Sequence, residues 1–152
     1  MSESKQKLLE LEKSRLYLFH GSSESDIKEL EPRQGYTIPK GKEKLIKDGE
    51  PAIAATPYAD IAIFRAIVRK GKSGFSASTK SAGISISFNA DKKGLDIAKN
   101  NIGYVYVLNK DGFVSRSGDD RHMEWRKATP TKPLFIYKVT YEDLPQKIKI
   151  IP

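Results

Sequence analysis

The chain has 152 residues, a length that suits one domain with its own hydrophobic core, and it contains no cysteine. The lack of cysteine excludes a disulfide framework, a thiol nucleophile, a zinc ribbon and an iron–sulfur centre. Because His20 and His122 are the two histidines of the chain, a histidine-rich metal site is not expected either. We therefore predict a site that works without a metal.

A net charge of +8 and an isoelectric point near 9.5 indicate attraction to polyanions, of which nucleic acid is the most common in a cell. An interpretation of equal weight is a lysine-rich surface that only keeps the protein soluble. The basic residues gather in two stretches, namely Lys40, Lys42, Lys44 and Lys47, followed by Arg65, Arg69, Lys70 and Lys72.

Residues 1–14, MSESKQKLLELEKS, carry charge from the third position onward and have no apolar stretch of the signal-peptide type. No apolar run approaches the roughly 20 residues needed to span a bilayer. A soluble, cytoplasmic protein without a membrane partner is therefore expected. Positions 4–13 predict a short helix, and residues 1–14 are interpreted as this helix or an extension before a single domain of residues 15–152.

The first part of that domain predicts a strand, a loop, a second strand and a helix. Residues 16–19 form an apolar run typical of a buried strand, which His20-Gly21-Ser22-Ser23 would end. Residues 33–50 are rich in Gly, Lys and Pro and predict a long surface loop.

A second short apolar strand is expected over residues 51–56. The helix is expected from about Tyr58 to Val68, because Thr56 can cap it and Pro57 suits its first position. Ile61, Phe64 and Val68 would share one of its faces.

The second part of the domain predicts mainly strands. Residues 69–83 have the composition of a linker and predict a flexible segment. Strand patterns follow at residues 84–88, 104–108, 134–141 and 148–151, and residues 122–126 predict the start of another. Short strands around one internal helix predict an α+β fold with a mostly antiparallel or mixed sheet. Since neither a G-x-G-x-x-G after a strand nor a G-x-x-x-x-G-K-[ST] motif occurs, Rossmann and P-loop nucleotide sites are not expected.

The junction His20-Gly21-Ser22 is the first candidate site. Glycine lets backbone N–H and C=O groups approach a ligand closely, and a histidine beside it adds a hydrogen-bonding ring. The alternative is an ordinary end of a strand.

Glu124 is the second candidate, placed between segments that resemble strands and beside His122, Trp125 and Arg126. A carboxylate there can stabilise a developing cation or position a hydroxyl. The alternative is an ion pair with Arg121 or Arg126 on a solvated edge. Aromatic residues that could stack on a flat ring, although most are expected to serve packing, are Tyr17, Tyr36, Tyr58, Phe64 and Trp125.

In this order the segments resemble the ADP-ribosyltransferase superfamily. Leu18-Phe19-His20-Gly21-Ser22 is similar to its first core strand, which ends in His-Gly-Ser, and residues 51–64 (PAIAATPYADIAIF) are similar to its second core strand and the following helix. Glu124-Trp125-Arg126, before the strand 134–141, is similar to the segment that carries the catalytic glutamate. The resemblance covers residues 15–145 and points to the His-Tyr-Glu branch, which includes poly(ADP-ribose) polymerases, diphtheria toxin-like proteins and DNA-modifying toxins.

The resemblance implies a split antiparallel or mixed sheet with few helices, and NAD as the co-substrate without a metal. Gly21 would hold the nicotinamide carboxamide through its backbone, Ser22 would assist there, and His20 would bond the adenosine-side ribose. Glu124 would bond the nicotinamide ribose and stabilise the oxocarbenium-like centre that forms when nicotinamide leaves. ADP-ribose would pass to a protein or, given the charge, a nucleic acid.

One element departs from the family. The tyrosine of the second strand is replaced here by Ala54 or Thr56, so Thr56, Tyr58 and Phe64 become the candidates for contacts with nicotinamide, the two aromatic residues by stacking. This departure keeps open a second interpretation, a module that binds NAD, ADP-ribose or nucleic acid without turnover. An RNA 2′-phosphotransferase is disfavoured, because that reaction is expected to need several arginines and a second histidine.

Overall fold

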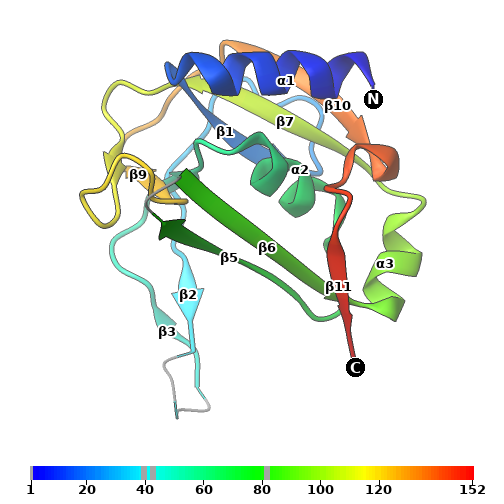
Figure 1. Cartoon of the computed structure of the whole chain (residues 1–152). Coiled ribbons are helices and arrows are strands. Elements are labelled where there is room, and N and C mark those ends of the chain that lie inside the picture. Colours follow the sequence, from blue (N-terminus) through cyan, green and yellow to red (C-terminus); the bar gives the residue numbers. More distant parts are fainter. Residues whose placement is uncertain (1, 39–40, 42–43, 81–82) are drawn as a thin grey trace.

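The computed structural model describes residues 2–38, 41, 44–80 and 83–152 (Figure 1). In chain order its elements are α1 (Glu3–Ser14), β1 (Tyr17–Ser22), β2 (Tyr36–Thr37), β3 (Ile46–Lys47), β4 (Ile53–Ala55), α2 (Ala59–Ile67), β5 (Ser73–Lys80), β6 (Gly83–Asp91), α3 (Lys92–Ala98), β7 (Ile102–Asn109), β8 (Val114–Ser115), β9 (Trp125–Lys127), β10 (Phe135–Thr140), the 3₁₀ turn η1 (Tyr141–Asp143) and β11 (Ile148–Ile151). Over these ranges, three α-helices accompany mostly antiparallel strands, which confirms the predicted α+β class. No helix of the described ranges is long and apolar enough to cross a membrane.

Two three-stranded sheets join at their edges to form the layer that carries the site. In the first, β7 lies between β1 and β10 and is antiparallel to both; the second has the order β4–β9–β8. They meet where Phe19 and Thr56 exchange both backbone hydrogen bonds, with N···O distances of 2.7 and 2.9 Å. The strands therefore follow one another in the order β10–β7–β1–β4–β9–β8.

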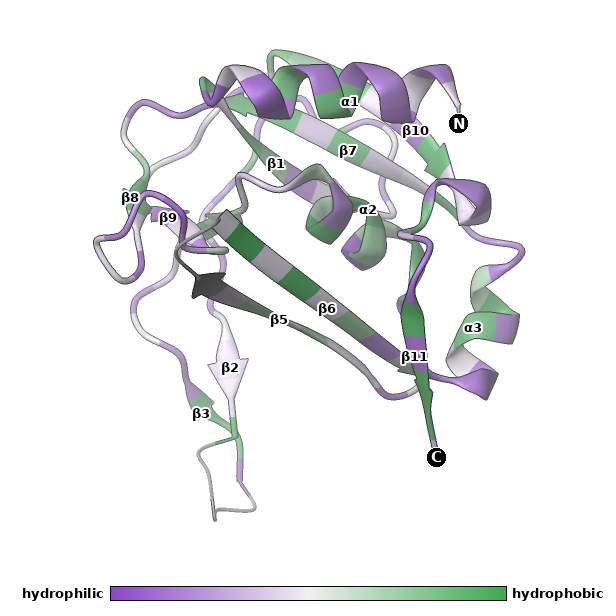
Figure 2. Cartoon of the chain, in the orientation of Figure 1, coloured by the Kyte–Doolittle hydropathy of each residue, from purple (hydrophilic) through white to green (hydrophobic). Residues whose placement is uncertain are grey.

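A separate sheet of β5, β6 and β11 faces this layer across α2 (Figure 1). Its strand β6 alternates hydrophobic and hydrophilic residues, as the period of a half-buried strand requires (Figure 2). Phe64 of α2 packs against Phe75 and Phe88 of this sheet, with ring centroids 6.3 and 5.0 Å away. Nearly every residue of α2 is buried, as expected for a helix between two sheets.

The sheet of β1 and β7 is buried on both faces. Phe19, Val105 and Val107 point into the main core with α2. Leu18 and Leu108, each offset by one residue, point into a second core that includes Trp125. Because neighbouring side chains of a strand face opposite sides, these short runs supply both cores.

Helix α1 confirms the helix predicted over residues 4–13 and belongs to the main core. Its Leu8 is wholly buried there. Glu12 Oε1 accepts a hydrogen bond of 2.6 Å from the backbone N–H of Ala59, the first residue of α2. Burial raises the pKa of this carboxyl, and the hydrogen bond from Ala59 opposes that shift. The N-terminal segment thus caps the helix that carries the site.

Two sequence-based predictions are wrong in detail, and one helix was not predicted. Residues 69–83 are not simply a flexible linker, because β5 occupies most of them and pairs with β6 along its length. Thr56 does not cap α2, since its backbone is held by Phe19 and the helix begins three residues later, with Tyr58 at the capping position. Helix α3, which Asp91 caps through the N–H of Gly94 at 2.8 Å, has too few buried residues for a periodic pattern and was not predicted.

The strands near the site differ from their predicted bounds. β1 extends through Ser22, because His20, Gly21 and Ser22 continue the pairing with β7. The predicted loop of residues 33–50 contains a two-residue antiparallel pairing of β2 with β3. Lys40 and Lys42, in the first basic stretch, lie outside the described residues. The strand predicted to start within residues 122–126 is β9.

Gly21 is expected to tolerate no side chain. A Cβ there would lie 2.0 Å from the carbonyl oxygen of Ala62, so α2 would have to move. We expect Gly21→Ala to lower the free energy of unfolding by about 1–3 kcal/mol or more, measured by urea titration of the fluorescence of Trp125, the one tryptophan. Gly74→Ala is the control, because its nearest neighbour would be 3.4 Å away. Equal losses in both variants would contradict this role.

Candidate functional site

The joint between the two sheets brings the predicted site residues together. His20 and Gly21 follow the Phe19–Thr56 bridge on β1. On the other side of β4, Ala55 pairs with Trp125, so Glu124 lies just before the start of β9. Segments about 100 residues apart therefore meet across three neighbouring strands.

These strands border a cavity with two parts. The main cleft has a volume of about 540 Å³, within the roughly 300–1,000 Å³ usual for ligand sites. The inner recess, of about 140 Å³, lies between β1, β4 and α2. His20, Ala54, Arg65 and Glu124 line both parts and mark the passage between them.

Gly21 presents its backbone to the inner recess. In an antiparallel strand, the N–H and C=O of residues two apart point to the same edge. Phe19 uses both groups on Thr56, so the groups of Gly21 point toward the same edge of β1, next to the recess that Gly21 lines. Beyond Thr56 the chain turns into α2, and no strand of the described ranges continues along that edge. The recess is thus bordered by one donor and one acceptor fixed side by side.

The ring of His20 is fixed as a neutral acceptor toward the cleft. Its Nδ1 lies 2.8 Å from the carbonyl oxygen of Ala54, which can only accept, so Nδ1 carries the proton. Burial, and then the positive charges of Arg65 and Arg33, lower the pKa of His20 against the opposing effect of the Ala54 hydrogen bond. A neutral ring with Nδ1 protonated has its lone pair on Nε2.

Glu124 is held by arginines. Its Oε2 accepts a 2.6 Å hydrogen bond from Arg116 Nη1 and lies 3.9 Å from Arg126 Nε. Arg116 also pairs with both carboxylate oxygens of Asp48, and Arg126 donates to the Asp48 carbonyl at 3.0 Å. This network, which we call the Glu124 clamp, ties the carboxylate to the segment after β3. The ion pair with Arg126 weighed from the sequence is therefore present, but its geometry is looser than that of Arg116.

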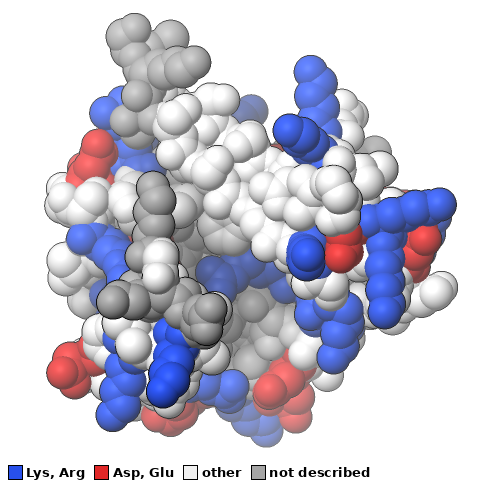
Figure 3. All heavy atoms as spheres, turned by 90° about the horizontal axis from the view of Figure 1, so that it is seen from below, with Lys and Arg blue, Asp and Glu red and all other residues white. Residues whose placement is uncertain are grey.

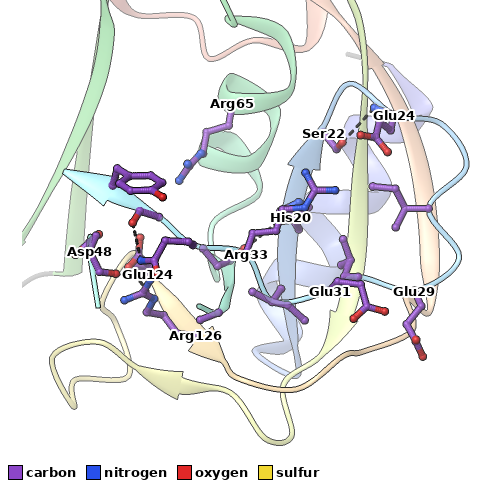
Figure 4. Close-up of a pocket in the computed structure, with 18 of the residues that line it drawn as sticks. His20, Ser22, Glu24, Glu29, Glu31, Arg33, Asp48, Arg65, Glu124 and Arg126 are labelled. Carbon is purple, nitrogen blue, oxygen red and sulfur yellow. Dashed lines mark hydrogen bonds and ion pairs between the residues drawn. The ribbon is translucent and has the colours of Figure 1, made fainter. Parts of the chain in front are cut away.

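Charge is distributed unevenly along the main cleft (Figure 4). Arg65 reaches from α2 into the cleft, and Arg33 lies between His20 and Glu124. Among the described residues, neither arginine forms a salt bridge. The far end of the cleft is lined by carboxylates, namely Glu24, Asp26, Glu29 and Glu31. The arrangement suits a ligand with an anionic middle and a neutral or hydroxyl-rich end.

The other predicted residues divide into two groups. Ser22 lines the main cleft, where its Oγ accepts from the N–H of Glu24 at 3.1 Å, and Thr56 lines the inner recess. Phe64, in contrast, is 2% exposed in the core. Tyr58 donates its hydroxyl to the Arg121 carbonyl at 2.5 Å, outside both parts of the cavity. The structure therefore does not bring these two aromatic rings to the site.

Tyr36 of β2, one of the aromatic residues that the sequence offered for stacking, lines the main cleft. Residues that sequence reasoning missed supply the other walls. Phe75 of β5 lines the recess, where Arg65 lies over its ring at 5.7 Å from the centroid. Arg33 had no local signal, and Arg65 was noted only as part of a basic stretch. Phe75 stood in the segment interpreted as a linker, so its only signal was an isolated aromatic among serines.

The surface shows no single basic patch on the face seen from below (Figure 3). Lys and Arg side chains are spread around it, with Asp and Glu between them. Within the described ranges, no group of three or more His, Asp or Glu residues is arranged to hold a metal ion.

Comparison with models of known families, with curated proteins and with solved structures finds no match to this chain.

Protonation of His20 should destabilise the fold in acid. Since the folded-state pKa lies below the ordinary 6.5, the unfolded chain takes up the proton first as the pH falls. The free energy of unfolding is then unaffected above about pH 6.5 and decreases below it, by up to about 1.4 kcal/mol per pH unit for one proton. His20→Gln should lose this part of the slope, measured by urea titrations between pH 7.5 and 5. Identical slopes in both proteins would refute the buried neutral ring.

The Glu124 clamp predicts a second measurable pKa. The hydrogen bond from Arg116 lowers the pKa of Asp48 below its ordinary 3.8. We expect Arg116→Gln to raise that pKa toward 3.8, followed by carbon-13 NMR titration of the carboxyl groups. Arg121→Gln is the control, because Arg121 pairs with Asp119 instead. An Asp48 titration that is the same in all three proteins would show that the clamp does not form in solution.

Proposed function

We propose that the chain is an NAD-dependent ADP-ribosyltransferase with the fold of that superfamily. The observation that carries the proposal is the backbone donor and acceptor of Gly21, fixed at the inner recess between His20 and Glu124. The layered antiparallel sheets and the order of the three segments along the chain support it, in agreement with the resemblance of the sequence.

The inner recess would hold nicotinamide. A carboxamide has one N–H₂ donor and one C=O acceptor, which match the C=O and N–H of Gly21. Apolar atoms of Ile61 and Phe75 line the same recess and would cover the pyridine ring. Helix α2 packs its backbone directly on Gly21, and this contact keeps the N–H and C=O groups of Gly21 in place.

The rest of NAD would extend along the main cleft. Nε2 of neutral His20 can accept a hydrogen bond from a ribose hydroxyl. Arg33 and Arg65 lie where the pyrophosphate would pass, and arginine matches phosphate oxygens with paired N–H donors. The carboxylates at the far end would accept from the hydroxyl and amino groups of adenosine.

The reaction needs a carboxylate at the passage between the two parts, which Glu124 occupies. The bond from C1′ of the ribose to the pyridinium nitrogen breaks, and its electron pair neutralises nicotinamide as it leaves. Positive charge grows at C1′, where a fixed carboxylate stabilises it. An N–H or O–H group of the acceptor then bonds to C1′ and releases its proton. With Ala54 in place of an aromatic residue, stacking on nicotinamide would fall to Phe75.

A second candidate is a module that binds NAD or ADP-ribose without turnover. The specific observation in its favour is the 2.6 Å hydrogen bond from Arg116 to Glu124, which already engages the carboxylate with a guanidinium. Both candidates share the Gly21 recess and His20. They differ in whether nicotinamide is released.

Glu124→Gln tests the reaction. We expect a loss of nicotinamide release of at least about 100-fold, as for removal of a group that stabilises transition-state charge, while NAD affinity by calorimetry changes little. Nicotinamide release and transfer of label from NAD to cell extract are measured. Glu142→Gln, an exposed glutamate on η1, is the control and should match the wild type.

The outcomes separate the two candidates. NAD binding that depends on His20 and Gly21, without any nicotinamide release, would support the binding module and reject the transferase. Absence of NAD binding in the wild type would reject the transferase, and absence of both NAD and ADP-ribose binding would reject both candidates.

A further inference from the structure

A group of lysines outside the cleft lies beside Asp91, where β6 ends and α3 begins. Lys70 and Lys72 are exposed on the turn between α2 and β5, and Lys92 and Lys93 are exposed in the first turn of α3. Asp91 joins the two turns, because its Oδ2 accepts from the N–H of Lys72 at 3.0 Å and its Oδ1 accepts from the N–H of Gly94 at 2.8 Å. These backbone hydrogen bonds, and then the charges of Lys72 and Lys93, lower the pKa of Asp91. We call Lys70, Lys72, Lys92 and Lys93 the lysine cluster.

The charge of the lysine cluster is not balanced locally. The carboxylate of Asp91 is engaged by backbone N–H groups of both turns. Asp96 of α3 pairs with Lys99, at 3.2 Å. Within the described ranges, no salt bridge joins a residue of the cluster to a carboxylate. An excess of cations therefore faces solvent beside the start of α3.

A groove begins at Ser73, the residue after Lys72, and reaches the wall of the inner recess. It has a volume of about 290 Å³ and runs along the start of β5, with Ser73, Gly74 and Phe75 on one side and Arg65 on the other. Phe75 and Arg65 also line the inner recess, so the groove and the recess share a wall. An extended strand rises about 3.3 Å per residue, which places Lys72 about 10 Å from Phe75 along β5.

We propose that this groove and the lysine cluster bind single-stranded nucleic acid as the acceptor. Lysines supply phosphate contacts that do not depend on sequence. The guanidinium of Arg65 lies over the Phe75 ring and offers a flat cationic face on which an unpaired base can stack, while its N–H edge remains for the phosphates of NAD. The bases of a duplex are stacked on one another and would not reach Arg65 and Phe75. An acidic peptide has no base to stack there and would contact only the lysines.

The groove is placed so that a bound strand would extend toward the proposed NAD site. A strand held by phosphates at Lys72 would carry its next nucleotides toward Phe75 and the recess, where C1′ of NAD would lie. In this respect the inference rests on the proposed function. The binding itself does not depend on NAD and is measured without it.

Binding is tested by fluorescence anisotropy with labelled 12-nucleotide oligodeoxythymidylate and oligouridylate. For contacts to four phosphates, affinity for a single strand should fall roughly 50-fold between 50 and 200 mM salt. Lys70→Gln/Lys72→Gln should reduce this to roughly 7-fold. Phe75→Leu should weaken binding about 5-fold or more at either salt concentration. The control is Lys132→Gln/Lys138→Gln, which removes the same charge from exposed positions at and before β10.

The proposal fails if the control pair weakens binding as much as Lys70→Gln/Lys72→Gln. It also fails if a duplex of the same length binds equally well while Phe75→Leu has no effect, or if polyglutamate of equal charge competes as effectively as the oligonucleotide. Urea unfolding of each variant, followed by Trp125 fluorescence, excludes misfolding as the cause. Binding that follows the lysines while the wild type releases no nicotinamide would reject the proposed reaction and retain the surface.

Discussion

The backbone bridge between Phe19 and Thr56 is the interaction on which the site depends. Its two hydrogen bonds join the sheet of β1 to that of β4, and through β4 they set the place of β9 and Glu124. The bridge also determines which backbone groups remain for a ligand. The N–H and C=O of Phe19 bond to Thr56, and those of Gly21 point to the same edge of β1. After Thr56 the chain leaves this edge and forms α2, so no strand of the described ranges pairs with Gly21 there. The recess is therefore bordered by a fixed amide donor and acceptor.

Packing keeps the recess rigid. Helix α2 is buried between two sheets, its first N–H is held by Glu12 of α1, and its backbone lies against Gly21 with no room for a Cβ. The helix therefore cannot shift toward or away from β1 without disturbing the main core. Arg65 of this helix is exposed and extends into the cavity. Because the helix is fixed, the charge of Arg65 has a defined place, although its side chain has no ion-pair partner among the described residues.

Electrostatics divide the cavity into parts with different chemistry. His20 is kept neutral by burial and by nearby arginines, so it offers an acceptor where a cation would repel Arg33 and Arg65. Carboxylates gather at one end of the main cleft, and Glu124 at the other is clamped by Arg116. The clamp has two consequences for the proposed reaction. It holds the carboxylate in one orientation, and it shares its negative charge with a guanidinium, which is why the distinction between turnover and binding is the decisive one for this protein.

The sequence by itself determined the class of fold, most strands, α1 and α2, because each depends on hydrophobic spacing or on a run of apolar residues that is local in the chain. It also indicated His20, Gly21 and Glu124, since a strand ending in a glycine and a carboxylate between strands are local patterns. Only the tertiary structure decided the rest of the site. Phe64 went to the core because both faces of α2 are covered, whereas Phe75 came to the recess because β5 pairs with β6. Arg33, Arg65 and Arg116 acquired their places from strand pairings between distant segments, and no local spacing encodes which charges such pairings bring together.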